Sequence, residues 1–541
     1  MEPTNEQLDI IDEKSHCVVI AKPGSGKTFT LSKKIKGILP DLSDYQGVIA
    51  ISHTNKASDE LKERSIEGGL QIKGSFFGTI DKFYISEIIL PFGNYLFGKP
   101  QKNVEIHSVK EEEFTKREDD KRVNILLETG YTKLEAKHSE WLKKQYLNGV
   151  VYLELVGLLA LYIFTRSVAC RTYLKARYTH IIIDEYQDSG AEQHEMFLKI
   201  KSLGVFAIAV GDADQSIFGF AKKDSRYLLE LAKDENKEFT VYTLNKNHRC
   251  HNSIVNYSMA FLNRNSNPIQ ADETRVFDQK VIGTQVEIAK WIDSNLTNIK
   301  NKFKVIDNNG AAILVRGDVS GRILDTNLST QHKYFKSTPL DADSNLWSQL
   351  FRELLYIIYD KDSNKYEMVK KYIDLNVDKR NAKYVLVQLQ EISEKLLQNP
   401  FDIENHVEKM IEIAKILLPN GENSKSLELF TQVINNHEYL NSYLPAKKDE
   451  VQIMTLHKSK GLEFDIVIHL DLYNYILPNP YNKDENQDIN LHYVGITRAK
   501  QALYLMWSTQ RINNNGEYKL GIKSDFLSRS YLEPLRTRFD V

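Results

Sequence analysis

The sequence predicts an α/β protein with two parallel-sheet cores, each interrupted by a helical insertion. From the N-terminus, short apolar runs with strand character alternate with amphipathic stretches, and the runs lie at residues 18–21, 48–52, 180–184 and 205–210. A second series of runs lies at residues 240–244, 311–316, 451–455, 465–470 and 502–507. This alternation is typical of a parallel sheet that helices cover on both faces. Two series of runs therefore predict two cores.

Two long segments of helical period, rich in Lys and Glu, interrupt the alternation. We interpret them as inserted helical subdomains, and the second is short. The expected division has a first core at 1–90 and 174–245, a first insertion at 91–173, a second core at 246–345 and 447–541, and a second insertion at 346–446.

The composition is that of a globular protein with balanced charge. The 541 residues include 71 Lys and Arg against 73 Asp and Glu, so DNA contact would require a local groove rather than a basic surface. Wide spacing of Cys17, Cys170 and Cys250 favours neither a disulfide framework nor a structural metal. The longest apolar stretch, residues 150–164, contains Glu154 and is shorter than the roughly 20 residues of a membrane span. We expect a buried helix there, and a cytoplasmic protein without membrane contact.

A phosphate-binding loop is predicted where the first strand-like run ends, in AKPGSGKT. Gly24 and Gly26 let the backbone curl so that successive N–H groups face one anion. Lys27 and Thr28 open a helix, which places a cation at the β- and γ-phosphates and a hydroxyl near Mg²⁺. Ala21 stands where the usual pattern has its first glycine. The alternative is a glycine-rich turn that binds nothing.

Two adjacent acids end a later strand-like run, in IIIDEYQDS. Asp184 is suited to hold Mg²⁺ and Glu185 to polarise the attacking water, a division of roles that needs neighbouring carboxylates beside the phosphate loop. After the following run, in VGDADQSIFGF, Gln215 is placed to sense the γ-phosphate. Phe218 and Phe220 offer flat rings for stacking on bases, with core packing as the alternative.

Nine motifs occur in the order and approximate spacing of the superfamily 1 helicases: TNEQ, AKPGSGKT, SHTNKAS, GTID, IIIDEYQDS, GDADQSIFGF, LNKNHR, VQIMTLHKSKGLEF and YVGITRAK. From Gln7 to Lys500 the chain resembles the UvrD, PcrA and Rep group. The resemblance implies two RecA-like P-loop NTPase domains that clamp ATP and Mg²⁺ between them. It also implies an ATP-dependent, 3′-to-5′ DNA helicase with DNA-stimulated NTP hydrolysis.

The same resemblance implies the nucleotide site. It assigns catalysis to Lys27, Asp184, Glu185, Gln215 and two arginine fingers, Arg249 and Arg498. It assigns nucleotide contacts to Gln7 at the adenine edge and to Ala21, Gly24, Ser25, Gly26, Lys27, Thr28, His248, Arg249, Glu463 and Arg498, and Mg²⁺ to Thr28 and Asp184. For Glu463, a solvated helix position is the alternative. Both arginines lie in the second core, so we expect them to reach the nucleotide only when the cleft closes.

A track for single-stranded DNA across both cores is implied as well. It consists of short polar side chains at strand ends, one imidazole and two aromatic rings: Thr54, Asn55, Thr79, Thr455, His457, Phe218 and Phe220. Asp81 departs from the family because it replaces a histidine and puts negative charge near DNA phosphate. His53 and His248 replace an aromatic phenylalanine and a tyrosine that stacks on adenine. Base selectivity is therefore open, with GTP and dATP as alternatives to ATP.

The short second insertion and short tail after Arg498 resemble the UvrD-like subunit of Gabija anti-phage systems. That resemblance implies a hetero-oligomer with an OLD-family nuclease, GajA. The leading hypothesis is a DNA-dependent ATPase and helicase that works with this nuclease. The alternative is an NTPase switch that DNA ends activate and that signals to the nuclease without productive unwinding. A non-enzymatic scaffold is disfavoured because the catalytic residues are intact, and a GTPase because TNKAS lacks a guanine-reading aspartate.

Overall fold

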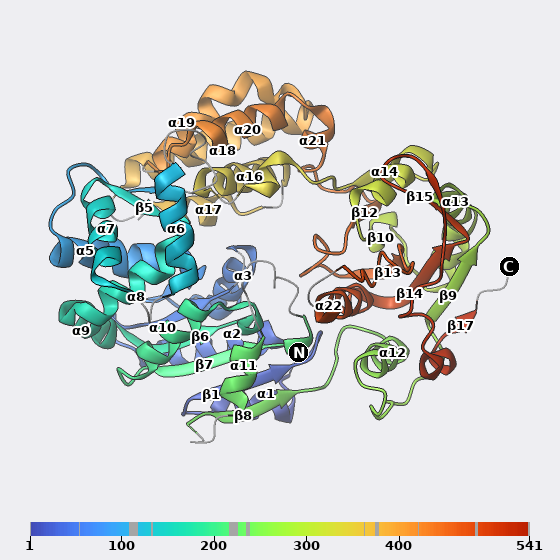
Figure 1. The fold of residues 1–541 in the computed structure, drawn as a ribbon, viewed down its shortest axis with the longest axis horizontal. Coiled ribbons are helices and arrows are strands. Elements are labelled where there is room, and N and C mark those ends of the chain that lie inside the picture. Colours follow the sequence, from blue (N-terminus) through green and yellow to red (C-terminus); the bar gives the residue numbers. More distant parts are fainter. Residues whose placement is uncertain are drawn as a thin grey trace.

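The computed structural model describes residues 2–52, 55–107, 117–130, 134–215, 225–233, 238–343, 345–361, 363–373, 378–419, 421–481 and 485–538. Two α/β blocks lie side by side, and a group of helices lies above the N-terminal block and the middle of the molecule (Figure 1). We call the N-terminal block, with a six-stranded sheet, core 1, and the C-terminal block, with a seven-stranded sheet, core 2. The predicted fold class, α/β with two RecA-like parallel-sheet domains, is confirmed.

The sheet of core 1 is parallel throughout. Its strand order is β3 (Phe76–Gly78), β2 (Gly47–Ile51), β6 (Tyr178–Ile183), β7 (Phe206–Gly211), β1 (Cys17–Ala21) and β8 (Thr240–Leu244). The accompanying helices are α1 (Asn5–Asp12), α2 (Lys27–Ile38), α3 (Asn55–Ile66), α10 (Ala191–Lys201) and α11 (Arg226–Ala232). Because the strands run in one direction, their carboxyl ends meet at one edge of the sheet, where ligands bind in this class of fold.

The sheet of core 2 is also parallel. Its order is β11 (His332–Tyr334), β12 (Val451–Thr455), β10 (Ala311–Val315), β13 (Phe464–His469), β14 (Ala499–Ser508), β9 (Val276–Val281) and β17 (Thr537–Arg538). Its helices are α12 (Asn252–Leu262), α13 (Gln285–Lys302), α14 (Asp318–Asn327) and α22 (Glu485–Ile496). A hairpin of β15 (Gln510–Ile512) and β16 (Tyr518–Leu520) extends from β14.

The first insertion continues the hydrophobic core of core 1. It contains α5 (Leu90–Phe97), α6 (Arg117–Thr129), α7 (Ala136–Leu147), α8 (Val156–Arg166) and α9 (Val168–Arg177), after the short helix α4 (Ile80–Phe83) and a π-helical turn at Tyr84–Ile89. Buried residues of α8 pack in one cluster with strands of the sheet. Among the described residues no single helix is long and apolar enough to cross a bilayer. The helical segments 153–166 and 168–177 meet that criterion only when taken together, and the chain bends by 97° between them.

The second insertion is an all-helical unit with its own hydrophobic cluster. Its helices are α15 (Pro339–Ala342), α16 (Leu346–Tyr359), α17 (Lys365–Tyr372), α18 (Lys379–Gln398), α19 (Val407–Leu417), α20 (Ser424–Ile434) and α21 (His437–Asn441). Figure 1 shows α16 to α21 above core 1 and the middle of the molecule. It contacts core 1 through Lys82, whose Nζ lies 4.7 Å from the centre of the Tyr372 ring. A cavity of about 1090 Å³ lies between this insertion and core 1, and no residue of the predicted nucleotide site lines it.

Two expectations about the strands were wrong. We grouped residues 240–244 with the runs of the second core, whereas our division at residue 245 put them in the first core, and β8 does pair with β1 in the sheet of core 1. The segment 91–173 was expected to be helical, but it also holds a small parallel sheet of β4 (Glu105–His107) and β5 (Val150–Tyr152). An apolar run indicates a strand without naming its partner, so the sheet to which a strand belongs depends on tertiary packing.

A buried lysine ties α2, the helix after the predicted phosphate loop, to α1. Lys34, on α2, is 3% exposed and its Nζ donates to the carbonyl oxygens of Ile10, Ile11 and Glu13, at 2.9, 3.2 and 2.6 Å. These carbonyls belong to the C-terminal end of α1, where unpaired acceptors and the negative end of the helix dipole favour a cation. Burial lowers the pKa of Lys34, in spite of the nearby acidic groups.

Replacing Lys34 with Met should therefore lower the free energy of unfolding by about 2 kcal/mol, because buried carbonyls lose a charged donor. The Lys14→Met variant, at an exposed position, serves as the control. Urea denaturation followed by intrinsic fluorescence measures both. Equal midpoints for Lys34→Met and the wild type would show that the contact contributes nothing to stability.

Candidate functional site

The phosphate-binding loop joins β1 to α2. Gly24 and Gly26 have φ angles of 70° and 83°, in the left-handed region that favours glycine. A Cβ on Gly24 would lie 2.7 Å from the Cβ of Arg249, and a Cβ on Gly26 would lie 2.6 Å from Nε2 of Gln7. Both glycines are therefore required by backbone conformation and by space. Ala21 is the last, fully buried residue of β1.

Gln7 fastens this loop to the first helix. Its Oε1 accepts a hydrogen bond from the Thr4 backbone N–H in the capping box of α1, and its Nε2 donates to the Ser25 carbonyl, both at 3.0 Å. Among the described residues, the Ser25 hydroxyl is buried and has no hydrogen-bond partner. A buried hydroxyl at the centre of such a loop needs an acceptor, and a phosphate oxygen would supply one.

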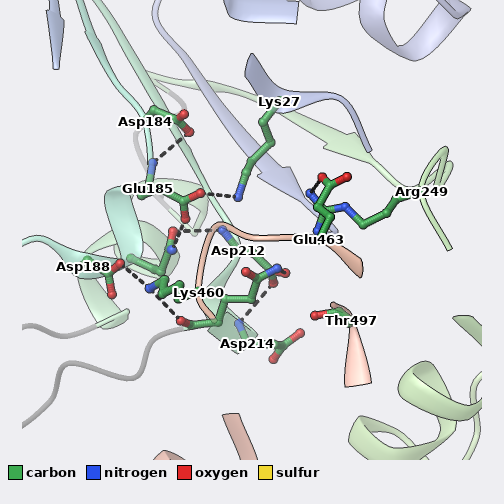
Figure 2. Close-up of polar contacts among 12 residues, drawn as sticks. Lys27, Asp184, Glu185, Asp188, Asp212, Asp214, Arg249, Lys460, Glu463 and Thr497 are labelled. Atoms are coloured by element: carbon green, nitrogen blue, oxygen red, sulfur yellow. Dashed lines mark hydrogen bonds and ion pairs between the residues drawn. The ribbon is translucent and has the colours of Figure 1, made fainter. Parts of the chain in front are cut away.

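The charges beside the loop form one coupled group, drawn in Figure 2. Lys27 Nζ lies 3.0 Å from Glu185 Oε1. Burial alone would lower the pKa of Lys27, but the carboxylates of Glu185, Asp184 and Asp212 outweigh burial and raise it. Burial, and then the charge of Glu185, raises the pKa of Asp184 to about 7. Although burial opposes it, the charges of Lys27 and Lys460 hold the pKa of Glu185 below its usual value.

Glu185 stands at a strained turn. Its backbone has φ 55° and ψ 42°, a left-handed conformation that residues other than glycine seldom adopt and that is often found at functional sites. The chain turns there from β6 into a single 3₁₀ turn, Tyr186–Asp188. The Glu185 N–H donates to Asp184 Oδ1 at 2.9 Å, which holds the two carboxylates in a fixed relation.

The donor set fits Mg²⁺ bound together with a nucleotide. Asp184 and the hydroxyl of Thr28, in the first turn of α2, are the residues that would hold the ion. Mg²⁺ prefers oxygen ligands, keeps several waters and binds through one or two protein groups plus substrate phosphates. Within the described part of the chain, no group of three or more His, Cys, Asp and Glu side chains is arranged to hold a metal alone. Phosphate oxygens would therefore complete the coordination.

Gln215 links core 1 to core 2. It ends the short 3₁₀ turn Ala213–Gln215 after β7, where its Nε2 donates to Asp212 Oδ2 at 3.1 Å. Burial raises the pKa of Asp212 to about 6, although Lys22 and Lys27 oppose this rise. The Oε1 of Gln215 accepts a hydrogen bond from Nη2 of Arg498 at 3.4 Å. Because Arg498 belongs to core 2, this bond crosses between the cores.

Arg498 is held by uncharged oxygens. It is 2% exposed, and its Nε and Nη1 donate to the carbonyls of Val494 and Leu462 at 3.0 and 3.1 Å. Burial, and then the positive charge of Arg249, lowers the pKa of Arg498 to about 10. Carbonyls do not neutralise a buried guanidinium, so an anionic phosphate would stabilise it strongly.

Arg249 differs from our expectation because its segment already packs on the phosphate loop. Asn247 Nδ2 donates to the Pro23 carbonyl at 2.7 Å, and the His248 N–H donates to the Gly24 carbonyl at 2.8 Å. The His248 ring itself is exposed. Arg249 therefore lies beside the loop because the two residues before it bond to the loop.

Glu463 pairs with this arginine. Its Oε1 lies 2.6 Å from Nη2 of Arg249, and Figure 2 draws the two side chains facing each other. Glu463 precedes β13 and lies outside any helix. The helix of the alternative was therefore wrong, although Glu463 is exposed.

The predicted DNA residues are only partly described. Thr79 caps α4 immediately after β3, while Thr455 ends β12 and His457 follows it. Burial, and then the charge of Arg316, lowers the pKa of His457 to about 4. Four further predictions lie outside the described residues: Thr54, the side chain of Asn55, Phe218 and Phe220.

Three polar residues were missed by sequence reasoning. Lys460 Nζ, from core 2, lies 2.6 Å from Asp188 Oδ2 and donates to the Gln215 carbonyl at 3.1 Å. Gln187 bonds both to Glu185 and to the backbone of Asp212. The polar residues QDS after DEY and SKG after TLHK could have indicated a role. Their partners, however, lie on other strands and on the other core, which the sequence does not specify.

Two family models match regions that hold most of the predicted site residues, although His248 and Arg249 lie between the two matches. The family model of the AAA domain matches residues 5–221, and that of the UvrD-like helicase C-terminal domain matches residues 351–510. The Gabija protein GajB of Bacillus cereus (strain VD045) is 29% identical, over 93% of this chain and 95% of the relative. The probable DNA helicase II homolog of Rickettsia conorii is 24% identical over 94% and 92%. The ATP-dependent DNA helicase PcrA of Staphylococcus aureus is 23% identical over 92% and 81%.

Replacing Glu185 with Gln should lower nucleotide turnover by about 10²-fold or more, because an amide keeps the shape but cannot polarise water as a carboxylate does. Nucleotide affinity should change little. Phosphate release and equilibrium nucleotide binding measure the two effects, with the surface variant Glu195→Gln as the control. Near-normal turnover in Glu185→Gln would refute the assignment of this carboxylate.

Proposed function

We propose that the chain couples ATP hydrolysis to movement along single-stranded DNA in the 3′-to-5′ sense. The premise is that it belongs to the UvrD-like helicases of superfamily 1 and is an ATP-dependent DNA helicase. Lys27 and the N–H groups of the loop bind the phosphates, and Thr28 and Asp184 hold Mg²⁺. Glu185 orients the attacking water. Bound Mg²⁺ neutralises charge on the transferred phosphoryl group.

The hydrogen bond between Arg498 and Gln215 carries this proposal. It joins a guanidinium of core 2 to the predicted γ-phosphate sensor of core 1. A planar guanidinium spreads positive charge over several phosphate oxygens, so its arrival stabilises the charge that develops during transfer. Hydrolysis then depends on the relative position of the cores, and that dependence is what a translocating motor needs.

A single loop of core 2 reaches both substrates. The segment between β12 and β13 carries the predicted DNA residues Thr455 and His457 at its start, and Glu463, which pairs with Arg249, at its end. Between them, Lys460 crosses to Asp188 of core 1. We place the DNA track at Thr79, Thr455 and His457, where polar groups at strand ends suit phosphate contacts.

We further propose that the protein acts in the cytoplasm as the GajB-like component of an anti-phage complex with an OLD-family nuclease, GajA. Similarity to the Gabija protein over nearly the whole of both chains supports this role. Co-purification of the chain with the product of the neighbouring gene, followed by nuclease and ATPase assays, tests it. Absence of a partner would remove the defence role and leave the motor intact.

The second candidate function is an NTPase switch that DNA ends activate and that signals to the nuclease without unwinding. The compact second insertion and Asp81, near the expected DNA phosphate, favour it. Strand displacement on tailed duplexes, measured beside ATPase activity, separates the two functions. A motor does both, whereas a switch hydrolyses nucleotide and leaves the duplex paired.

In the Arg498→Lys variant, the charge is kept but the planar fork is lost. We expect turnover to fall about tenfold or more and nucleotide affinity to change much less, because the fork acts in the transition state. Single-stranded DNA should stimulate this variant poorly. ATPase rates with and without DNA are the measurement, and Arg511→Lys, on the hairpin of core 2, is the control. Normal stimulation of Arg498→Lys would mean that coupling runs through another residue.

A further inference from the structure

The side chain of Gln187 is fully buried and both ends of its amide are engaged. Its Nε2 donates to Glu185 Oε2 at 2.5 Å, and its Oε1 accepts from the Asp212 N–H at 3.0 Å. Gly211 leaves room for this arrangement, since a Cβ there would lie 2.4 Å from the Gln187 Oε1. The amide therefore occupies a gap between the ends of β6 and β7. Any residue other than glycine at position 211 would close this gap.

The orientation of this amide follows from its partners. A backbone N–H can only donate, so the atom that faces Asp212 must be the carbonyl oxygen. The NH₂ group is then left for Glu185, whose ionised carboxylate can only accept. Neither bond survives if the amide is reversed.

We propose that Gln187 is a positioning residue that aims the Glu185 carboxylate for its reaction with water and ties it to core 2. The inference rests on the proposed role of Glu185. Lys27 holds the other carboxylate oxygen, Oε1, but the phosphates compete for its ammonium group. The bonds of Gln187 lie wholly within core 1 and involve no phosphate-binding group, so they keep Oε2 fixed and leave Oε1 to face water.

A continuous path of hydrogen bonds passes through Gln187. From Glu185 it runs to Gln187, to Asp212, to Gln215 and, at 3.4 Å, to Arg498 of core 2. A shift of Arg498 thus acts on the segment that orients Glu185. Gln187 joins the Glu185 carboxylate to the rest of this path. It therefore both positions the carboxylate and couples it to core 2.

Gln187→Glu separates positioning from plain structural support. The new carboxylate keeps the oxygen that accepts from Asp212 but, when ionised, has no hydrogen to donate to Glu185. We expect kcat to fall about tenfold or more, since small displacements of a catalytic group are costly, with KM and nucleotide affinity nearly unchanged. Gln187→Leu, which lacks both bonds, should be at least as slow and should lose stimulation by single-stranded DNA.

Tyr186→Phe, at the residue before Gln187, is the matched control. It removes the hydrogen bond between the Tyr186 hydroxyl and His194. It should keep both kcat and DNA stimulation. Full activity in Gln187→Glu would overturn the inference. So would losses of kcat in both Gln187 variants that are proportional to their losses in melting temperature. Gln187→Leu combined with Arg498→Lys should lose less than the product of the two single losses, and strict additivity would also contradict the path. An active Gln187→Glu beside an inactive Glu185→Gln would reject this inference and leave the proposed function standing.

Discussion

Charges buried in the cleft between the cores must be compensated there, and this constraint organises the site. Removing a charge from water is costly unless a partner or a strong hydrogen-bond donor takes the place of water. Lys27 is paired with Glu185, Lys460 with Asp188 and Arg249 with Glu463. The second of these pairs joins core 2 to core 1, so the electrostatic balance of the site depends on how the cores are placed.

In the proposed motor, the same constraint would let nucleotide and DNA influence each other. A nucleotide brings negative charge to Lys27 and to the uncompensated guanidinium of Arg498, and so changes which pairs are favourable. The loop from β12 to β13 joins the predicted DNA contacts to Lys460 and Glu463 over a few residues. Under the proposed function, movement of that loop on DNA would act on groups beside the predicted phosphate site.

Sequence reasoning predicted the two parallel sheets and most strands of their centres, because buried parallel strands appear as unbroken apolar runs. It also singled out residues whose chemistry is evident from their type, such as Lys27 and Glu185, and the structure brings these two within 3.0 Å of each other. It missed the edge strands β3, β11 and β17 and the inner strand β9. It also missed the role of Gln187, whose partner Asp212 follows the neighbouring strand β7. A glutamine acquires such a role only from its neighbours in space, and one sequence does not specify those neighbours.

The structure of the protein with Mg²⁺, ADP and aluminium fluoride, a mimic of the transferred phosphoryl group, tests the central claim most directly. We predict that Arg249 and Arg498 both contact the fluoride, that Lys27 has moved from Glu185 to the phosphates, and that Glu185 bonds to the water in line for attack while Gln187 still holds its Oε2. A complex in which Arg498 keeps only its carbonyl partners and lies away from the fluoride would contradict a single active site built from both cores.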